Sequence, residues 1–293
     1  MPVILSEAGF TDEHTINGRE LKAITETAGI MGFRVIPLPR DLEAVGGAEA
    51  VFEWTPVFDP PEIGLWAGYI PAVERYREVY QAAALHGIRL INDPAEHVRA
   101  MDFDGLYQRL EGLTPESRTS DSVDGAAVAA AELGYPVFVK GAVKSSKESG
   151  WSACVADNEV QLRDIAAFLM SRPGRSRGRI IVRRLAPLRR TGETPGGFPL
   201  SREYRVFLLQ HEVISFGYYW EGTDDPWPLT EEDRRNMLEV VCEGSRRLEV
   251  PFVAIDAGQL KSGEWIIIES GDAQFCGLSQ ASMLGIWNRL SSV

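Results

Sequence analysis

Hydrophobic positions along this chain follow two spacings, which predicts that helices and strands alternate. Apolar residues spaced by three or four positions predict helices, whereas short apolar runs between turn residues predict strands. In the N-terminal part this pattern predicts helices at 17–31 and 72–86, and strands at 33–37, 49–54 and 88–91. Alternation of this kind is typical of an α/β lobe.

A second lobe is expected to begin near Asp93. Asp93 can cap a helix, Pro94 suits its first position, and Glu96 completes a capping box. Beyond it the same spacings predict helices at 123–133 and 159–170, and strands at 135–140, 151–155 and 179–183.

A third lobe follows a long stretch, 186–201, that has no regular pattern, and such stretches are usually functional or mobile. The pattern then predicts paired strands at 203–210 and 212–219, a loop at 220–228, a helix from Thr230 to about Leu248, two strands at 252–260 and 265–269, and a helix at 280–290. We therefore expect an α/β to α+β fold with an N-terminal domain, 1–92, and two further lobes, 93–185 and 186–293. The apolar faces of helices 72–86 and 280–290 suit either a core or a homodimer interface.

Two carboxylates on the predicted C-terminal hairpin are the most informative feature. If Ser262 and Gly263 form a two-residue turn, Asp256 lies directly opposite Glu269. Opposed side chains share a face, and like charges there repel. Asp272 follows three residues later, so these three acids predict a divalent cation held by oxygen ligands.

Composition narrows the class of protein. The chain has 293 residues, 44% of them hydrophobic, which is enough for more than one lobe. A formal charge of −12 argues against nucleic acid or an anionic membrane as the main partner. The three scattered cysteines form no disulfide or zinc pattern, and the N-terminus does not resemble a signal peptide. A cytoplasmic protein is the expectation, because no apolar run reaches membrane-spanning length.

A basic loop follows the predicted strand that ends at Lys140. Backbone N–H groups of the loop 141–150, with Ser145 and Ser146, suit phosphate oxygens, while Lys140, Lys144 and Lys147 supply positive charge. The alternative for Lys144 and Lys147 is a solvated hairpin tip. Lys140 differs, because its strand neighbours suggest a covered face on which the charge needs a partner.

A second group of charged residues lies on strands. Glu203 and Arg205 are two residues apart and therefore share a face of their strand. Arg205 suits a transferring phosphoryl group or a developing oxyanion, and the alternative is a structural Glu–Arg pair. Arg183 and Arg184 end the strand that precedes the long irregular stretch, and surface charge is the alternative for both.

Taken in order, the stretches YPVFVKGAVKS, IIVRRLAPL, REYRVFLL and VAIDAGQL followed by WIIIESGD resemble the ATP-grasp superfamily. The resemblance covers about 88–277 and is closest to the subgroup with an arginine pair and one lysine. It implies two lobes that grip ATP, with Lys140 on the α- and β-phosphates and the loop 141–150 closing over them. It further implies an adenine-binding hinge at Arg183, Arg184 and Leu185, a polar pair of Glu203 and Arg205, and Mg²⁺ ligands Asp256, Glu269 and Asp272.

Three departures from the family pattern stand out. No lysine occurs between Met101 and Leu113, so Tyr107 or Arg109 would have to replace the first lysine of many relatives. Arginines stand at the hinge in place of an acid, and the last metal pair reads Glu-Ser-Gly-Asp rather than Glu-x-Asn.

The resemblance implies an ATP- and Mg²⁺-dependent ligase that joins a small-molecule carboxylate to an amine through an acyl phosphate. Phosphoryl transfer depends mainly on positioning and charge neutralisation, which suits these residues. Two alternatives remain at this point: an inactive ATP-binding interaction module, and a metal-dependent hydrolase that uses the same acids.

Overall fold

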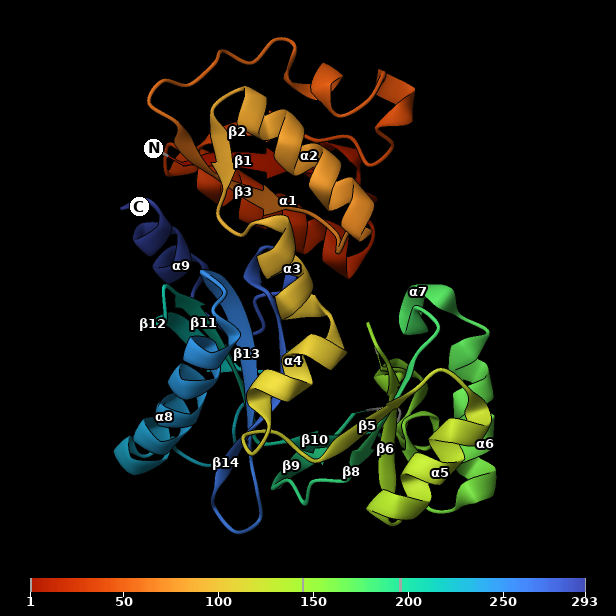
Figure 1. Cartoon of the computed structure of the whole chain (residues 1–293). Helices are drawn as coiled ribbons and strands as arrows, with labels where there is room; N and C mark the ends of the chain where they lie inside the picture. Colours follow the sequence, from red (N-terminus) through yellow and green to blue (C-terminus); the bar gives the residue numbers. More distant parts are fainter. Residues whose placement is uncertain (1, 144, 195–196, 293) are drawn as a thin grey trace.

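Three four-stranded sheets divide the chain into lobes (Figure 1). The computed structural model describes residues 2–143, 145–194 and 197–292. The ATP-grasp architecture expected from the sequence is confirmed by its mixture of helices and sheets and by the structural similarities reported below. The three expected ranges each contain one of the sheets.

The N-terminal lobe is a parallel sheet in the order β2-β1-β3-β4 with helices packed on it. Its elements are β1 (Val3–Ser6), α1 (Ile16–Ile30), β2 (Arg34–Pro37), β3 (Glu62–Ala67), α2 (Val73–Leu85) and β4 (Ile88–Leu90). The predicted strand at 49–54 is wrong, because this segment is a short 3-10 helix anchored by the buried side chain of Phe52. The strand beside β1 is instead β3, whose Leu65 and Trp66 are buried.

The middle lobe is an antiparallel sheet in the order β5-β8-β6-β7. Its elements are β5 (Ser117–Ser120), α5 (Val123–Leu133), β6 (Val137–Gly141), β7 (Val155–Ala156), α6 (Glu159–Met170), α7 (Pro173–Ser176) and β8 (Ile180–Arg184). Helix α5 has the predicted bounds and is capped by Ser122. The predicted strand 151–155 is mostly wrong, because a 3-10 helix occupies Trp151–Ala153.

The C-terminal lobe is an antiparallel sheet in the order β12-β11-β13-β14. Its elements are β11 (Glu203–Leu209), β12 (Glu212–Tyr218), α8 (Glu231–Leu248), β13 (Phe252–Gln259), β14 (Trp265–Asp272) and α9 (Met283–Leu290). The stretch expected to be irregular contains a small hairpin, β9 (Arg190–Glu193) with β10 (Pro199–Ser201). Helix α8 starts at the predicted cap, Thr230, with acids in its first turn and arginines in its last, which suits its dipole.

Two helices in the second expected range pack on the C-terminal sheet. These are α3 (Pro94–Met101), which begins with the predicted capping box, and α4 (Phe103–Leu110). Phe103, Leu106 and Leu110 share a core with α8 and the sheet. Figure 1 shows α4 beside this sheet, apart from α5 and α6 of the middle lobe.

Six short 3-10 helices complete the described secondary structure. They are η1 (Ala8–Phe10), η2 (Glu43–Val45), η3 (Glu49–Phe52), η4 (Lys147–Ser149), η5 (Trp151–Ala153) and η6 (Ala273–Phe275).

Helices cover both faces of the C-terminal sheet, which fixes the direction of each side chain on β13. Odd-numbered residues such as Val253 and Ile255 enter the core with α8. Even-numbered residues such as Phe252 and Ala254 face the other way, into a core with α1 and α9. Alternation along the strand therefore places Asp256 on the face that is turned away from α8.

Candidate active site

Two adjoining cavities lie between the lobes. The hinge cavity, about 370 Å³, is bounded by the middle sheet, the segment 183–188 and β14, and its apolar lining includes Phe138, Leu185 and Ile268. The central cavity, about 590 Å³, reaches from the same junction to the N-terminal lobe. Lys140, Ser145, Lys147 and Glu269 line both.

The carboxylates of Asp256 and Glu269 face each other from β13 and β14, as predicted. The predicted turn is wrong, however. Leu260 N donates to Glu264 O at 2.8 Å, so three residues, 261–263, form the loop. A β-bulge at Ile268 restores the pairing, because Ala257 is opposite Ile267 while Asp256 is opposite Glu269. Gly258 makes room for this bulge, since a Cβ there would lie 2.9 Å from Ile268.

Each carboxylate of this pair has a cationic partner. Lys140, at the end of β6, donates to Glu269 across the cleft, and its side chain is buried. Arg205, opposite Asp256 on β11, makes two parallel bonds of 2.8 Å to both Asp256 oxygens. Its remaining Nη1 donates to Gly277 O at 2.8 Å. Bidentate geometry of this kind fixes both side chains.

These partners determine the charge state of the cleft. Burial alone would raise the pKa of Glu269, but the charges of Lys140 and Lys147 outweigh it and lower that pKa to about 2. Burial likewise opposes the charge of Arg205, yet Asp256 raises its pKa well above the usual value. The site therefore contains ionised acids and bases that largely neutralise each other at neutral pH.

Glu203 and Lys147 form a second charged group. Glu203 lies opposite Gly258 and shares the cleft face with Arg205 and Asp256. Its carboxylate is buried, and Oε2 has no hydrogen-bond partner within the described residues. Burial raises the pKa of Glu203, while the charge of Lys147 opposes this change. Burial would lower the pKa of Lys147, but Glu203 and the other acids raise it.

The loop after β6 contributes only some of its predicted residues. Ser145 lines both cavities, and its carbonyl accepts from Arg175 Nη1 at 2.6 Å. Ser146 is buried but lines neither cavity. Lys147 carries its ammonium 5.5 Å from the Tyr219 ring centroid. Lys144 lies outside the described residues.

The three hinge residues line the hinge cavity but differ in burial. Arg183 is buried and donates to Ile268 O at 2.8 Å and to Thr114 Oγ1 at 2.6 Å. Burial lowers its pKa to about 10, against the charge of Glu269. Arg184 is exposed and pairs with Glu116 at 3.0 Å. Arg183 thus holds the carbonyl of the bulged residue beside Glu269.

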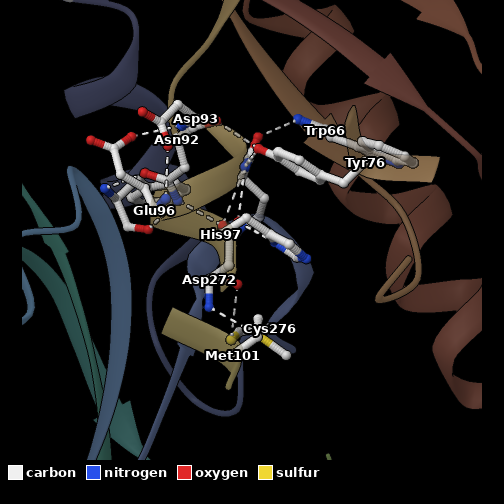
Figure 2. A network of polar contacts seen from close by, with 11 residues as sticks. Trp66, Tyr76, Asn92, Asp93, Glu96, His97, Met101, Asp272 and Cys276 are labelled. Carbon is white, nitrogen blue, oxygen red and sulfur yellow. Dashed lines mark hydrogen bonds and ion pairs between the residues drawn. The ribbon is translucent and has the colours of Figure 1, made fainter. Parts of the chain in front are cut away.

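Asp272 does not join the other two acids, so the predicted three-acid metal site is wrong. Three residues separate it from Glu269, which places it opposite Val253 and on the other face of the sheet. Its fully buried carboxylate accepts from Asn92 Nδ2 at 2.8 Å and from His97 Nδ1 at 2.9 Å (Figure 2). No group of three or more potential metal-binding side chains occurs in the part of the chain that the structure describes.

The proposed replacements for the first lysine also lie elsewhere. Arg109 is directed to the surface, where it pairs with Glu249 at 2.9 Å. Tyr107 accepts from Ser117 N through its hydroxyl at 3.1 Å. The buried guanidinium near Lys140 and Glu269 is instead that of Arg183, stacked 5.6 Å from the Phe103 ring centroid.

Sequence reasoning missed the contribution of the N-terminal lobe. Asn17 and Glu20 of α1 and Tyr69 after β3 line the central cavity. Glu20 Oε1 accepts from Leu278 N at 2.6 Å, next to the Gly277 carbonyl that Arg205 contacts. No ion pair of Glu20 is found among the described residues. Only a signal linking residues far apart in the chain would have found this wall.

The residues present fit a nucleotide and a divalent cation. The apolar hinge cavity suits a base, the free Oε2 of Glu203 suits a donor of the bound nucleoside, and the lysines at the junction suit phosphates. Mg²⁺ commonly takes one or two protein carboxylates together with substrate phosphates. Asp256 and Glu269 supply that number.

Comparison with known proteins agrees with this architecture. An ATP-grasp domain family, family 3 of the clade with two arginines and one lysine, matches residues 129–290, more than half of the chain. No curated protein sequence matches it. Within the described residues, no helix combines the length and apolar character needed to cross a membrane.

Several solved structures share the fold. A RimK domain protein ATP-grasp from Sphaerobacter thermophilus is 15% identical with a TM-score of 0.57, covering 94% of this chain and 92% of that chain. D-alanine–D-alanine ligase from Bacillus anthracis, complexed with ATP, is 15% identical with a TM-score of 0.62, covering 100% and 91%. L-amino acid ligase from Bacillus licheniformis is 16% identical with a TM-score of 0.56, covering 92% and 66%.

At these identities the structural likeness shows the fold alone, whereas the family match extends over the middle and C-terminal sheets and both strands of the carboxylate pair. An ATP-grasp domain supports ATP binding and ATP-dependent ligation as the class of activity. On this match, the chain belongs to the ATP-grasp domain family, in family 3 of the clade with two arginines and one lysine.

Proposed function

We propose that this protein is an ATP-dependent ligase that joins a small-molecule carboxylate to an amine and releases ADP and phosphate. The observation that carries the proposal is the contact between Lys140 and Glu269. These side chains come from different sheets and meet where an apolar cavity joins a polar one. A triphosphate bound across this junction would have its base in the hinge cavity and its γ-phosphate at the central cavity.

The first step is phosphoryl transfer to the acid substrate. An oxygen of its carboxylate forms a bond to the γ-phosphorus while the bond to the leaving ADP oxygen breaks. Lys140 and Lys147 neutralise phosphate charge, and Arg205 is oriented for the transferring group because Asp256 holds it from both oxygens. Mg²⁺ bound by Asp256 and Glu269 would supply further charge neutralisation on the phosphate oxygens.

The second step is attack of the amine on the acyl carbon. The C–N bond forms, the C–O bond to phosphate breaks, and the nitrogen loses a proton. Glu20 supports an amine substrate, because it is a central-cavity carboxylate for which no cationic partner is found in the described chain. A substrate ammonium would complete that charge pair before it loses its proton.

The test is ADP release from Mg-ATP across a panel of carboxylic and amino acids, each with and without added amines. The proposal expects ADP release that requires both an acid and an amine, and Glu269→Gln should reduce it at least a hundredfold. Glu264→Gln is the matched control, because Glu264 lies on the same hairpin but contacts only the exposed Ser262. Nucleotide binding without ADP release would favour an inactive ATP-binding module, and turnover without ATP would favour a hydrolase.

A further inference from the structure

Asp272 is the centre of a buried polar network that joins two lobes (Figure 2). It ends β14, three residues after Glu269, and is 0% exposed. Besides Asn92 and His97, its carboxylate accepts from the backbone N of Gln274 at 3.1 Å. A buried carboxylate needs such donors, because an unpaired charge there is costly. None of these contacts belongs to the cleft between the middle and C-terminal sheets.

Asn92 connects this carboxylate to the neighbouring strand. It follows β4 of the N-terminal lobe and is fully buried. Its Nδ2 donates both to Asp272 Oδ1 and to Phe252 O, each at 2.8 Å, and its Oδ1 accepts from Phe252 N at 2.9 Å. The side-chain amide therefore pairs with the first residue of β13 as another strand would, just where β14 has ended.

Gln274 makes the second connection between the lobes. Its Oε1 accepts from Trp66 N of β3 at 2.8 Å, and its Nε2 donates to the Tyr76 hydroxyl of α2 at 3.0 Å. Tyr76 in turn donates to Asn92 O at 2.7 Å and stacks on His97 with ring centroids 4.2 Å apart. Gln274 also lines the central cavity, so this network lies directly behind that cavity.

The same strand thus carries two acids with different surroundings. Glu269 points into the cleft, whereas Asp272 binds the N-terminal lobe that supplies Asn17, Glu20 and Tyr69 to the central cavity. We propose that Asp272 is a positioning residue, which holds the N-terminal wall of the substrate cavity at a fixed place relative to Glu269. This inference rests on the proposed function, because it assigns the central cavity to the non-nucleotide substrates.

The test compares Asp272→Asn with Glu269→Gln, two carboxamide substitutions on one strand. Hydrogen exchange is measured at Trp66 and Phe252, whose N–H groups donate to Gln274 and Asn92, with Ile267 as internal control because its N–H donates to Leu113 O. Binding of adenylyl imidodiphosphate is measured at increasing Mg²⁺ concentration.

We expect D272N to speed exchange at Trp66 and Phe252 at least tenfold, to leave Ile267 within twofold, and to leave the Mg²⁺ concentration for half-maximal nucleotide binding within twofold. E269Q should raise that Mg²⁺ concentration at least fivefold and leave the exchange of Trp66 and Phe252 unchanged. With an acid and amine that turn over, D272N should raise the KM of the acid at least fivefold while the KM of ATP stays within twofold.

The inference is overturned if D272N shifts the Mg²⁺ dependence as E269Q does, or if exchange at Trp66 and Phe252 does not change. Should D272N fail to fold, Gln274→Met removes the bonds to Trp66 and Tyr76 while Asp272 keeps Asn92 and His97. It should then speed exchange at Trp66 alone, and unchanged exchange there would again refute the idea. Failure of the wild-type chain to bind nucleotide would refute the proposed function, while exchange still tests the connection between the lobes.

Discussion

Arg202, which sequence reasoning did not single out, offers the sharpest test of the energetics near the cleft. It precedes β11 and is only 1% exposed. Its Nε donates to Asp225 at 2.7 Å, and its Nη1 donates to Asp233 at 3.0 Å and to Gln259 Oε1 at 2.8 Å. These contacts join the loop 220–228 to α8 and β13. Asp225 is itself only 8% exposed at its side chain.

Replacing Arg202 with Met keeps most of the stem but removes every one of these donors. The carboxylates of Asp225 and Asp233 then lose their cation, and breaking a buried pair from one side typically costs about 3–5 kcal/mol. We expect the free energy of unfolding to fall by about that amount. The measurement is urea unfolding followed by far-UV circular dichroism, with the slope compared between variants to verify that the same surface is exposed.

A double variant separates the charge from the packing. In R202M/D225N the buried carboxylate becomes a neutral amide that can still accept from the Tyr204 hydroxyl, now 2.7 Å from Asp225. It should therefore regain about 1–2 kcal/mol relative to R202M. Arg184→Met is the control, since Arg184 is 57% exposed and its pair with Glu116 contributes at most about 1 kcal/mol. A loss below about 1 kcal/mol in R202M, or no recovery in the double variant, would contradict this reasoning.

Three further predictions concern the cleft. Lys140→Met should slow ADP release about 10²–10³-fold, because a buried charge that stabilises phosphate is lost; the exposed Lys22→Met serves as control, and equal rates in a coupled assay would remove the role of Lys140. Since the Glu269 pKa is lowered to about 2 from its usual value, its contribution to stability is present above about pH 4.5 and disappears as the pH falls to about 2. After allowance for its partial exposure this amounts to about 1–2 kcal/mol, and acid titrations of unfolding should be flatter over this range in E269Q. Glu20→Gln should raise the KM of the amine about tenfold, roughly 1.4 kcal/mol, with the KM of ATP unchanged, and equal KM values for the amine would exclude Glu20 from its binding.

The sequence was sufficient for features that depend on local pattern. Helix α5 and the caps at Asp93 and Thr230 follow from spacing and from side chains that satisfy free backbone N–H groups. The facing of Asp256 and Glu269 was also predicted, although for an incorrect reason. The two-residue turn and the regular ladder were both wrong, and the two errors cancelled.

Features that depend on distant parts of the chain could not be predicted in this way. Asp272 was grouped with Glu269 by proximity in sequence, yet an odd separation on a strand places side chains on opposite faces. Its partners, Asn92 and His97, come from a segment about 180 residues earlier. The partners of Arg202 are likewise contributed by three separate elements. No local pattern encodes such contacts, because they form only when the lobes pack.

The bulge at Ile268 has a consequence for how the length of this hairpin can vary. The loop 261–263 has one residue more than a regular ladder would need to align the two acids, and the bulge absorbs that residue. Arg183 binds the carbonyl of Ile268, so the middle lobe secures this absorbed residue from across the hinge. Removing one loop residue should therefore be harmless only if the ladder straightens at the same time. Deletion at the tip and loss of the Arg183 contact are thus coupled changes, and a relative that lacks one should lack the other.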